Sequence, residues 1–142
     1  MTDPSCRVCS GAWPAAEHFI ADLGLSTAYL HEDQFFPGWT VVVFKRHARE
    51  LFELAPTERI QLMEEVSRLA KVLFETFEAN KMNYAQLGNQ IPHMHWHVIP
   101  RLPNDPAPLE PVWSVEHDRL VLLPDQGQAL IARIRTALGR MV

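Results

Sequence analysis

Three histidines alternate with apolar residues in one short stretch of the chain. Residues 92–100 read Pro-His-Met-His-Trp-His-Val-Ile-Pro. Because successive side chains of a strand point to opposite faces, a strand here would place His93, His95 and His97 on one face. Pro92 and Pro100 fit the ends of such a strand, since proline is excluded from the middle of a sheet. The stretch therefore predicts one packing face and one row of imidazoles, which titrate near neutral pH and suit catalysis or ligand binding.

The rest of the sequence predicts short strands, one long helix and a C-terminal helix. Apolar residues recur every three or four positions from Pro56 onward, which predicts an amphipathic helix of about 24 residues. Further helices are expected at 14–21 and 126–138, and strands at 27–30, 39–44, 82–87 and 95–100. Strands joined mostly by short loops favour an α+β fold, an antiparallel sheet with helices packed on one face. We expect residues 1–142 to form a single domain.

Composition narrows the range of partners. The chain has a net charge of −4, with 47% apolar and 21% charged residues. A net negative charge argues against nucleic acid or an anionic membrane as the main partner, so a polyphosphate would have to be bound by local donors. The sequence shows no apolar run of membrane-spanning length and no signal-peptide pattern at its start. A cytoplasmic location is expected.

The order of several short segments resembles the histidine triad (HIT) family of nucleotide hydrolases and transferases. These segments are Phe36-Pro37-Gly38-Trp39, residues 41–47, Leu87-Gly88-Asn89, and the histidine stretch running into Ile99-Pro100-Arg101. The resemblance covers roughly residues 20–105 and is to the bacterial, diadenosine polyphosphate hydrolase-like branch. It implies a sheet of about five strands in each subunit of a homodimer, and a purine nucleotide or dinucleoside polyphosphate as substrate.

The resemblance also implies a role for each histidine. His95 would attack the α-phosphate of a nucleotide and form a covalent nucleotidyl-histidine, oriented by a main-chain carbonyl just before it. His97 would stabilise charge on the phosphoryl group as a cation or an N–H donor, and His93 would support the site without attacking. The nucleotide-binding residues implied are Asn83, Gly88, Asn89, Gln90, His31 and Asp33. His31 stands where relatives place the Asn or Asp that binds the ribose hydroxyls. The carboxylate of Glu32 or Asp33, beside it in the sequence, is the alternative for binding the ribose.

The only two cysteines, Cys6 and Cys9, form a C-x2-C pair. In a reducing compartment this spacing favours metal or redox chemistry over a stable disulfide. Many bacterial HIT-like proteins and the galactose-1-phosphate uridylyltransferases carry such a pair, and the resemblance implies a structural zinc ion completed by His47 and His93. The alternative is two idle thiols at a frayed N-terminus. No organic cofactor is expected.

Three functions are compatible with these features. The first is a hydrolase, or a nucleotidyltransferase, that acts at the α-phosphate of dinucleoside polyphosphates or nucleoside phosphoramidates. The second is a non-catalytic nucleotide sensor or adaptor of the same fold. The third, a catalytic metal held by the histidine row, ranks last, because histidines about 6.6 Å apart along a strand do not converge on one ion at about 2 Å.

Several other residues are expected to be structural. Trp39 is expected to pack beside the Pro-Gly turn, with contact to the base as the alternative. Trp113 is expected to anchor the core or a dimer contact, with a place at the substrate edge as the alternative. His117 is expected to be a solvated surface residue, and the charged residues of the long helix, Glu65 among them, are expected to face solvent.

Overall fold

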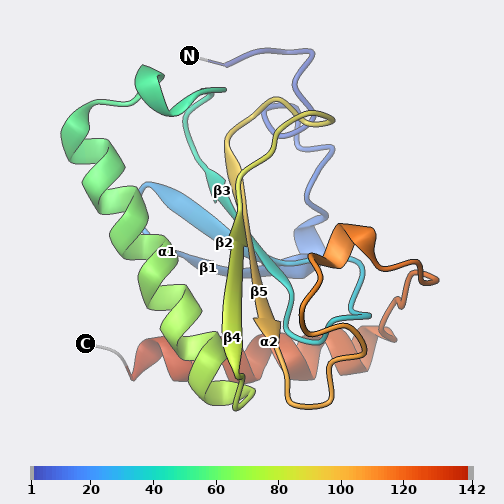
Figure 1. Ribbon diagram of the computed structural model, residues 1–142. Coiled ribbons are helices and arrows are strands. Elements are labelled where there is room, and N and C mark those ends of the chain that lie inside the picture. Colours follow the sequence, from blue (N-terminus) through green and yellow to red (C-terminus); the bar gives the residue numbers. More distant parts are fainter. Residues whose placement is uncertain (1, 141–142) are drawn as a thin grey trace.

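Five antiparallel strands form one sheet at the centre of the structure. The computed structural model describes residues 2–140, and its strands are β1 (Phe19–Asp22), β2 (Ser26–Leu30), β3 (Thr40–Phe44), β4 (Lys81–Ala85) and β5 (His95–Arg101). They lie in the order β1-β2-β3-β5-β4, and every neighbouring pair is antiparallel. Figure 1 shows this sheet with the helices around it. The predicted α+β class is confirmed.

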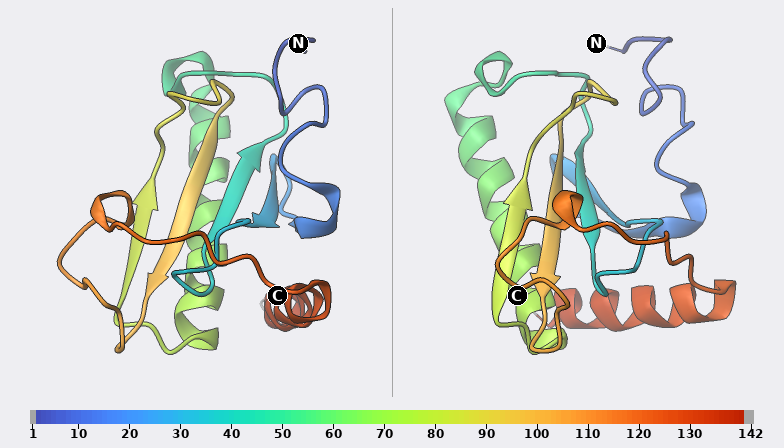
Figure 2. Two further views of the ribbon diagram at one scale, coloured as in Figure 1. Left: turned by 90° about the vertical axis from the view of Figure 1, so that its right-hand side faces the viewer. Right: turned by 45° about the vertical axis from the view of Figure 1, so that its right-hand side comes forward.

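The two faces of the sheet are covered differently. Helix α1 (Pro56–Thr76) covers one face, and the segment after β5, which includes the 3-10 helix η3 (Val112–Ser114), crosses the other (Figure 2). Helix α2 (Pro124–Gly139) packs against α1 and β1. In the part of the chain that the structure describes, no helix is long and apolar enough to cross a membrane.

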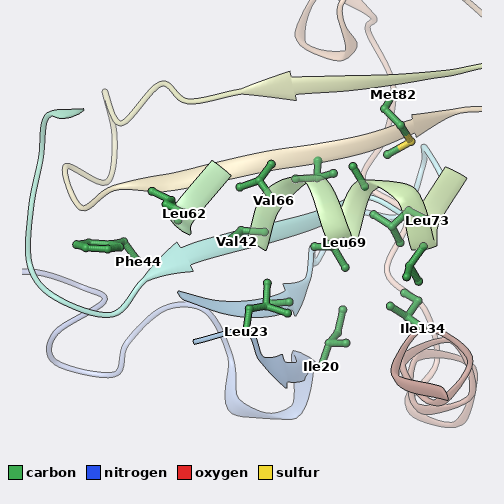
Figure 3. Close-up of a cluster of buried hydrophobic side chains, with 14 of the residues drawn as sticks. Ile20, Leu23, Val42, Phe44, Leu62, Val66, Leu69, Leu73, Met82 and Ile134 are labelled. Carbon is green, nitrogen blue, oxygen red and sulfur yellow. The ribbon is translucent and has the colours of Figure 1, made fainter. Parts of the chain in front are cut away.

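The main hydrophobic core lies between α1 and the sheet. Leu62, Leu69 and Leu73 of α1 are completely buried. Figure 3 shows them directed toward the strands, with Val42 of β3 opposite them and Ile134 of α2 nearby. Burying one such leucine side chain stabilises the fold by about 1.5–3 kcal/mol. A smaller cluster on the other face of the sheet contains Phe36, Trp39, Ile99 and Val112.

Helices α1 and α2 begin with the same local pattern. Pro56 and Pro124 occupy the first helical turn, where the missing N–H of proline costs no hydrogen bond. The side-chain oxygens of Glu58 and Gln126 each accept a hydrogen bond from the N–H of the residue before the proline, at 2.8 and 3.1 Å. Helix α1 has 21 residues, close to the predicted length.

The helix predicted at 14–21 is wrong. Only Ala16–His18 forms a single 3-10 turn, η1. The residues that follow form β1, which pairs with β2 and buries Ile20 completely. Strand formation depends on the neighbour with which a segment pairs, and this pairing overrides the weak local preference for helix.

Strand β5 begins at His95, as predicted, and ends at Arg101 instead of Pro100. His93 therefore lies in the preceding loop. The strand runs through Pro100, because β3 pairs with β5 only as far as Val98 and β4 is the only partner beyond that point. Proline is tolerated there, since one side of the strand needs no ladder hydrogen bond. The expected row of three imidazoles on one strand therefore reduces to His95 and His97.

Glu65 is buried, and the prediction that it faces solvent is wrong. Its carboxylate accepts hydrogen bonds from the N–H groups of Leu25 and Ser26 at 2.9 Å, and from the Ser26 hydroxyl at 2.6 Å. Gly24 has a φ of +129°, and a Cβ at this position would lie 2.6 Å from the Glu65 carboxylate. Glu65 therefore joins α1 to the turn between β1 and β2, which a side chain at Gly24 would push away.

Candidate active site and metal cluster

The ring of His95 is held in one tautomer by its own backbone. Its Nδ1 lies 2.7 Å from the main-chain carbonyl oxygen of His93. A carbonyl only accepts hydrogen bonds, so Nδ1 carries the proton and Nε2 keeps its lone pair. Burial lowers the pKa of His95, and the hydrogen bond to His93 offsets this only in part. His95 is therefore a neutral imidazole with one free nucleophilic nitrogen.

The ring of His97 is held in the opposite tautomer to that of His95. The indole N–H of Trp39 donates to His97 Nδ1 at 3.0 Å, which leaves the ring proton on Nε2. Burial lowers the pKa of His97 to about 3, with His95 and His31 adding to the effect. The rings of His95 and His97 lie 5.3 Å apart. Of the two roles expected for His97, the geometry favours the neutral N–H donor.

Aromatic rings surround this pair. His31 stacks on Trp39 at 4.1 Å, and Trp113 meets the ring of His97 edge-on at 5.0 Å. Trp39 is buried, as expected of a packing residue, but its N–H also sets the tautomer of His97. Trp113 is half exposed and lies at the rim of the site, which matches the alternative of a substrate-edge position and not that of a core anchor.

A cleft of about 620 Å³ opens over the two histidines, a size typical of small-molecule sites. Of the residues expected from the sequence, it brings together His31, Asp33, Gly88, Asn89, Gln90, His95 and His97. Asn83 lies instead in an adjoining cavity of about 330 Å³. There its side-chain oxygen accepts a hydrogen bond from the buried Arg101 at 2.8 Å. The structure therefore separates Asn83 from the histidines.

Asp33 is occupied by contacts within the protein. One carboxylate oxygen accepts a hydrogen bond from His117 Nε2 at 2.8 Å, and the other accepts from the N–H groups of Phe35 and Leu120 at 3.0 Å. Burial raises the pKa of Asp33, but these hydrogen bonds outweigh burial and lower it overall. Asp33 thus fastens the segment after η3 to the loop that follows β2.

His117 is not the solvated surface residue that was expected. Its ring stacks on Phe35 at 4.0 Å and lines the cleft. The hydrogen bond to Asp33 raises the pKa of His117. No local sequence pattern predicted that His117 would line the cleft, because its hydrogen-bond partner, Asp33, lies far away in the sequence.

Sequence reasoning also missed three residues that line the cleft. Arg7 and Trp13 come from the N-terminal segment, and Arg119 comes from the segment after η3. The ring of Trp13 meets that of His95 edge-on at 5.0 Å. All three lie outside the segments that carried the family resemblance, so the sequence offered no signal for them.

The two cysteines and two of the histidines gather in one cluster. The ligand atoms of Cys6, Cys9, His47 and His93 all lie within 4.8 Å of one another. His93 Nδ1 lies 3.4 and 3.7 Å from the two sulfur atoms and 3.2 Å from His47 Nδ1, while Cys9 Sγ lies 3.5 Å from His47 Nδ1. The expected four residues are therefore close enough to share one metal ion.

The shape of the cluster fits zinc. Tetrahedral zinc with bonds of about 2.3 Å to sulfur and 2.0–2.1 Å to nitrogen has ligand atoms roughly 3.3–3.8 Å apart. The four separations given above, 3.2–3.7 Å, lie close to that range. His93 Nε2 donates to the Phe44 carbonyl at 2.6 Å, so Nδ1 turns its lone pair toward the cluster. Burial lowers the pKa of His93 and keeps it neutral, as a metal ligand must be.

Comparison with known proteins shows the family. The model of the HIT domain family matches residues 14–104. A bis(5'-nucleosyl)-tetraphosphatase (asymmetrical) from Schizosaccharomyces pombe is 30% identical over 107 residues, which cover 72% of this chain and 59% of that relative. The chain thus spans less than two thirds of the relative's length.

Solved structures resemble the whole fold. A histidine triad protein from Bradyrhizobium japonicum superposes with a TM-score of 0.77 at 34% identity, over 86% of this chain and 92% of that one. A zinc-bound histidine triad family protein from Mycobacterium smegmatis gives a TM-score of 0.70 at 24% identity, over 96% and 95%, a likeness of fold alone. The family model covers most of the chain, and the chain belongs to the histidine triad (HIT) family.

Proposed function

We propose that the protein hydrolyses nucleotides at the α-phosphate, through a covalent nucleotidyl intermediate on His95. One observation carries the proposal: His95 presents a free Nε2 while its Nδ1–H is held by the His93 carbonyl. Beside it, His97 presents an N–H. A neutral nucleophile next to a fixed donor is the pairing that nucleophilic attack on phosphorus requires. The name of the fission yeast relative supports dinucleoside polyphosphates as substrates.

In the first step His95 Nε2 gives its lone pair to the α-phosphorus. The N–P bond forms as the bond to the leaving group breaks, and the leaving group departs with the electron pair. The His95 ring becomes cationic while its Nδ1–H remains bound to the His93 carbonyl. His97 Nε2–H donates to a phosphoryl oxygen and stabilises the charge that develops there.

In the second step water attacks the same phosphorus. The N–P bond breaks, its electron pair returns to His95 Nε2, and the proton of the water passes to solvent. A polyphosphate leaves as a stable anion, whereas an amine must gain a proton before it leaves. Because His97 is a neutral donor with a pKa lowered to about 3, we expect polyphosphates to be the better substrates and phosphoramidates the poorer ones.

We place the nucleoside against the wall formed by His31, Trp39 and His117. These aromatic rings line the cleft, with His31 stacked on the buried Trp39, and a base can pack against them. The loop of Gly88, Asn89 and Gln90 would then lie beside the phosphates, where amide groups donate to phosphate oxygens. Gly88 has a φ of +77°, a conformation that favours glycine and lets this loop turn back toward His95.

We propose that the cluster of Cys6, Cys9, His47 and His93 holds a structural zinc ion. Four protein ligands fill a tetrahedral site and leave no position for water, so the ion would cross-link the chain and take no part in the reaction. His93 belongs to both centres, because its ring faces the cluster and its carbonyl orients His95. The ion would thereby stiffen the support of the nucleophile.

The test is release of AMP from diadenosine tetraphosphate and from adenosine 5'-phosphoramidate by wild type, His95→Ala and His18→Ala. His18 lies in η1, outside the cleft, and serves as the matched histidine control. We expect release by wild type and His18→Ala only, faster from the tetraphosphate. Binding of AMP without release by any of the three would overturn the hydrolase and favour the sensor or adaptor.

The homodimer and the cytoplasmic location remain predictions. Strands β1 and β4 form the two edges of the sheet, and each has one strand neighbour. An edge strand can pair with another chain. Light scattering across a range of protein concentrations would give the oligomeric state.

A further inference from the structure

Arg7 combines two features that set it apart from other surface arginines. It lies between Cys6 and Cys9 in the sequence, and it lines the same cleft as His95 and His97. Its side chain is exposed, and within residues 2–140 its guanidinium has no ion-pair partner and donates no hydrogen bond. A permanent positive charge is therefore available at the edge of the site.

The backbone around Arg7 is tightly held. The Cys9 N–H points at Cys6 Sγ at 3.4 Å, and the Ser10 N–H donates to the Cys6 carbonyl at 2.9 Å. The Trp13 N–H donates to the Arg7 carbonyl at 2.9 Å, and the Trp13 ring meets that of His95. Figure 2 shows this N-terminal segment beside the end of the sheet where β5 begins. Arg7 thus lies on the N-terminal segment that lines the cleft and that places Trp13 against His95.

The second arginine of the cleft serves a different part of it. Arg119 follows His117, whose side chain is bound to Asp33. Arg119 and His31 both line the cleft, and the Arg119 guanidinium adds to the lowering of the His31 pKa by burial. His31 belongs to the wall at which we place the nucleoside. The other arginine of the cleft, Arg7, comes from the N-terminal segment, whose Trp13 contacts the His95 ring.

We propose that Arg7 binds the phosphate groups of the leaving group, those beyond the α-phosphate, and so selects polyphosphate substrates; this rests on the proposed function. The chain carries a net charge of −4, so a polyanion must be held by local cations. A guanidinium offers paired N–H donors that match phosphate oxygens. Arg7 is then a specificity-determining residue for the length of the phosphate chain.

A metal ion bound by the cluster would hold the loop that carries Arg7. Cys6 and Cys9 flank it, and both sulfur atoms face His93, whose carbonyl orients His95. With the cluster loaded, the arginine and the nucleophile are fixed to one centre. Without a metal ion the loop from Cys6 to Cys9 would keep only its own hydrogen bonds, and we expect it to move and carry Arg7 away from the cleft.

Calorimetric binding of AMP, ADP and ATP tests the proposal without turnover, in a His95→Ala background. We expect Arg7→Ala to weaken ADP and ATP binding by about tenfold, as loss of a charge-assisted contact predicts, and AMP binding by less than about twofold. Arg140→Ala, which changes net charge equally at the end of α2, is the matched control. Equal losses for all three nucleotides, or no loss, would overturn the role of Arg7.

Removal of the metal ion is a second test of the role of Arg7. Chelation with EDTA, followed by calorimetry, should reduce the preference for ATP over AMP as far as Arg7→Ala does, and should add nothing in Arg7→Ala itself. Additive losses would show that the metal does not act through Arg7. In turnover, Arg7→Ala should slow diadenosine tetraphosphate about tenfold and leave adenosine 5'-phosphoramidate unchanged. If wild type releases no AMP at all, the hydrolase fails, while the binding experiment still decides on Arg7.

Discussion

Replacing Trp39 with Phe removes the hydrogen bond that fixes the proton of His97 on Nε2. The indole N–H donates to His97 Nδ1 at 3.0 Å in a buried position. Without it, Nδ1 is left as an unpaired acceptor, and the ring can move its proton to Nδ1 and take it away from the phosphoryl group. A neutral buried hydrogen bond contributes about 0.5–1.5 kcal/mol, and an unsatisfied buried group costs about 1–3 kcal/mol.

These energies set the expected effect. Since about 1.4 kcal/mol corresponds to a factor of ten, we expect Trp39→Phe to lower kcat for diadenosine tetraphosphate roughly 10- to 100-fold. Nitrogen NMR of the His97 ring would report the tautomer directly. The phenyl ring keeps a face for His31 to stack on, so we expect AMP binding to change little.

The matched control is Trp113→Phe. The ring of Trp113 also contacts His97, at 5.0 Å, but edge-on and without a hydrogen bond. It should keep kcat within about threefold, since an aromatic edge contact is worth about 0.5–1.5 kcal/mol and phenylalanine preserves most of it. A Trp39→Phe enzyme that turns over at the wild-type rate, with the His97 proton still on Nε2, would refute the reasoning.

Three further changes should alter stability. Cys6→Ser with Cys9→Ser should release zinc, measured by atomic emission, and lower the melting temperature while His95 still reacts. Glu65→Ala should lower the free energy of unfolding in urea by about 2–4 kcal/mol, because buried donors lose their acceptor, whereas the exposed Glu64→Ala should change it by less than about 0.5 kcal/mol. His117→Gln should be less stable than wild type at acid pH. The pKa of His117 is raised, so its contribution is fully present below the ordinary value of 6.5 and disappears as pH rises through the raised pKa.

For each of these three stability predictions, one result would contradict the expectation. Wild-type protein purified without chelators and found free of zinc would remove the metal from the account. Equal losses in Glu65→Ala and Glu64→Ala would mean that the buried carboxylate does not join α1 to the β1–β2 turn. A stability difference between wild type and His117→Gln that is constant with pH would exclude protonated His117 as the partner of Asp33.

The sequence predicted those parts of the molecule that repeat or follow a local pattern. The amphipathic spacing after Pro56 placed α1, and alternation placed most of β5. The chain was less informative where a distant partner decides the outcome. Phe19–Asp22 becomes a strand only because β2 is beside it, and Glu65 is buried only because the turn after β1 supplies donors. Neither partner is visible in the local sequence.

The sequence likewise predicted some residues of the candidate site and missed others. The C-x2-C spacing, with the two histidines that the family resemblance supplied, led to four residues that the fold does bring together. The residues that form the wall of the cleft could not be predicted in this way. Arg7, Trp13 and His117 belong to segments that lie far from β5 in the sequence. Asn83, by contrast, was predicted to bind the nucleotide but lies outside the cleft. It lies on β4 beside β5, but Arg101 binds its side-chain oxygen away from the histidines.

The most direct test of the account is to look for the covalent intermediate. Wild-type protein mixed with diadenosine tetraphosphate would be quenched within milliseconds under conditions that preserve phosphoramidates, then digested and mapped by mass spectrometry. We predict a mass increase of one adenylyl group on His95, absent in His95→Ala. AMP release by the wild-type protein with no adduct on any histidine, or with the adduct on His97 or His93, would contradict the assignment of His95 as the nucleophile.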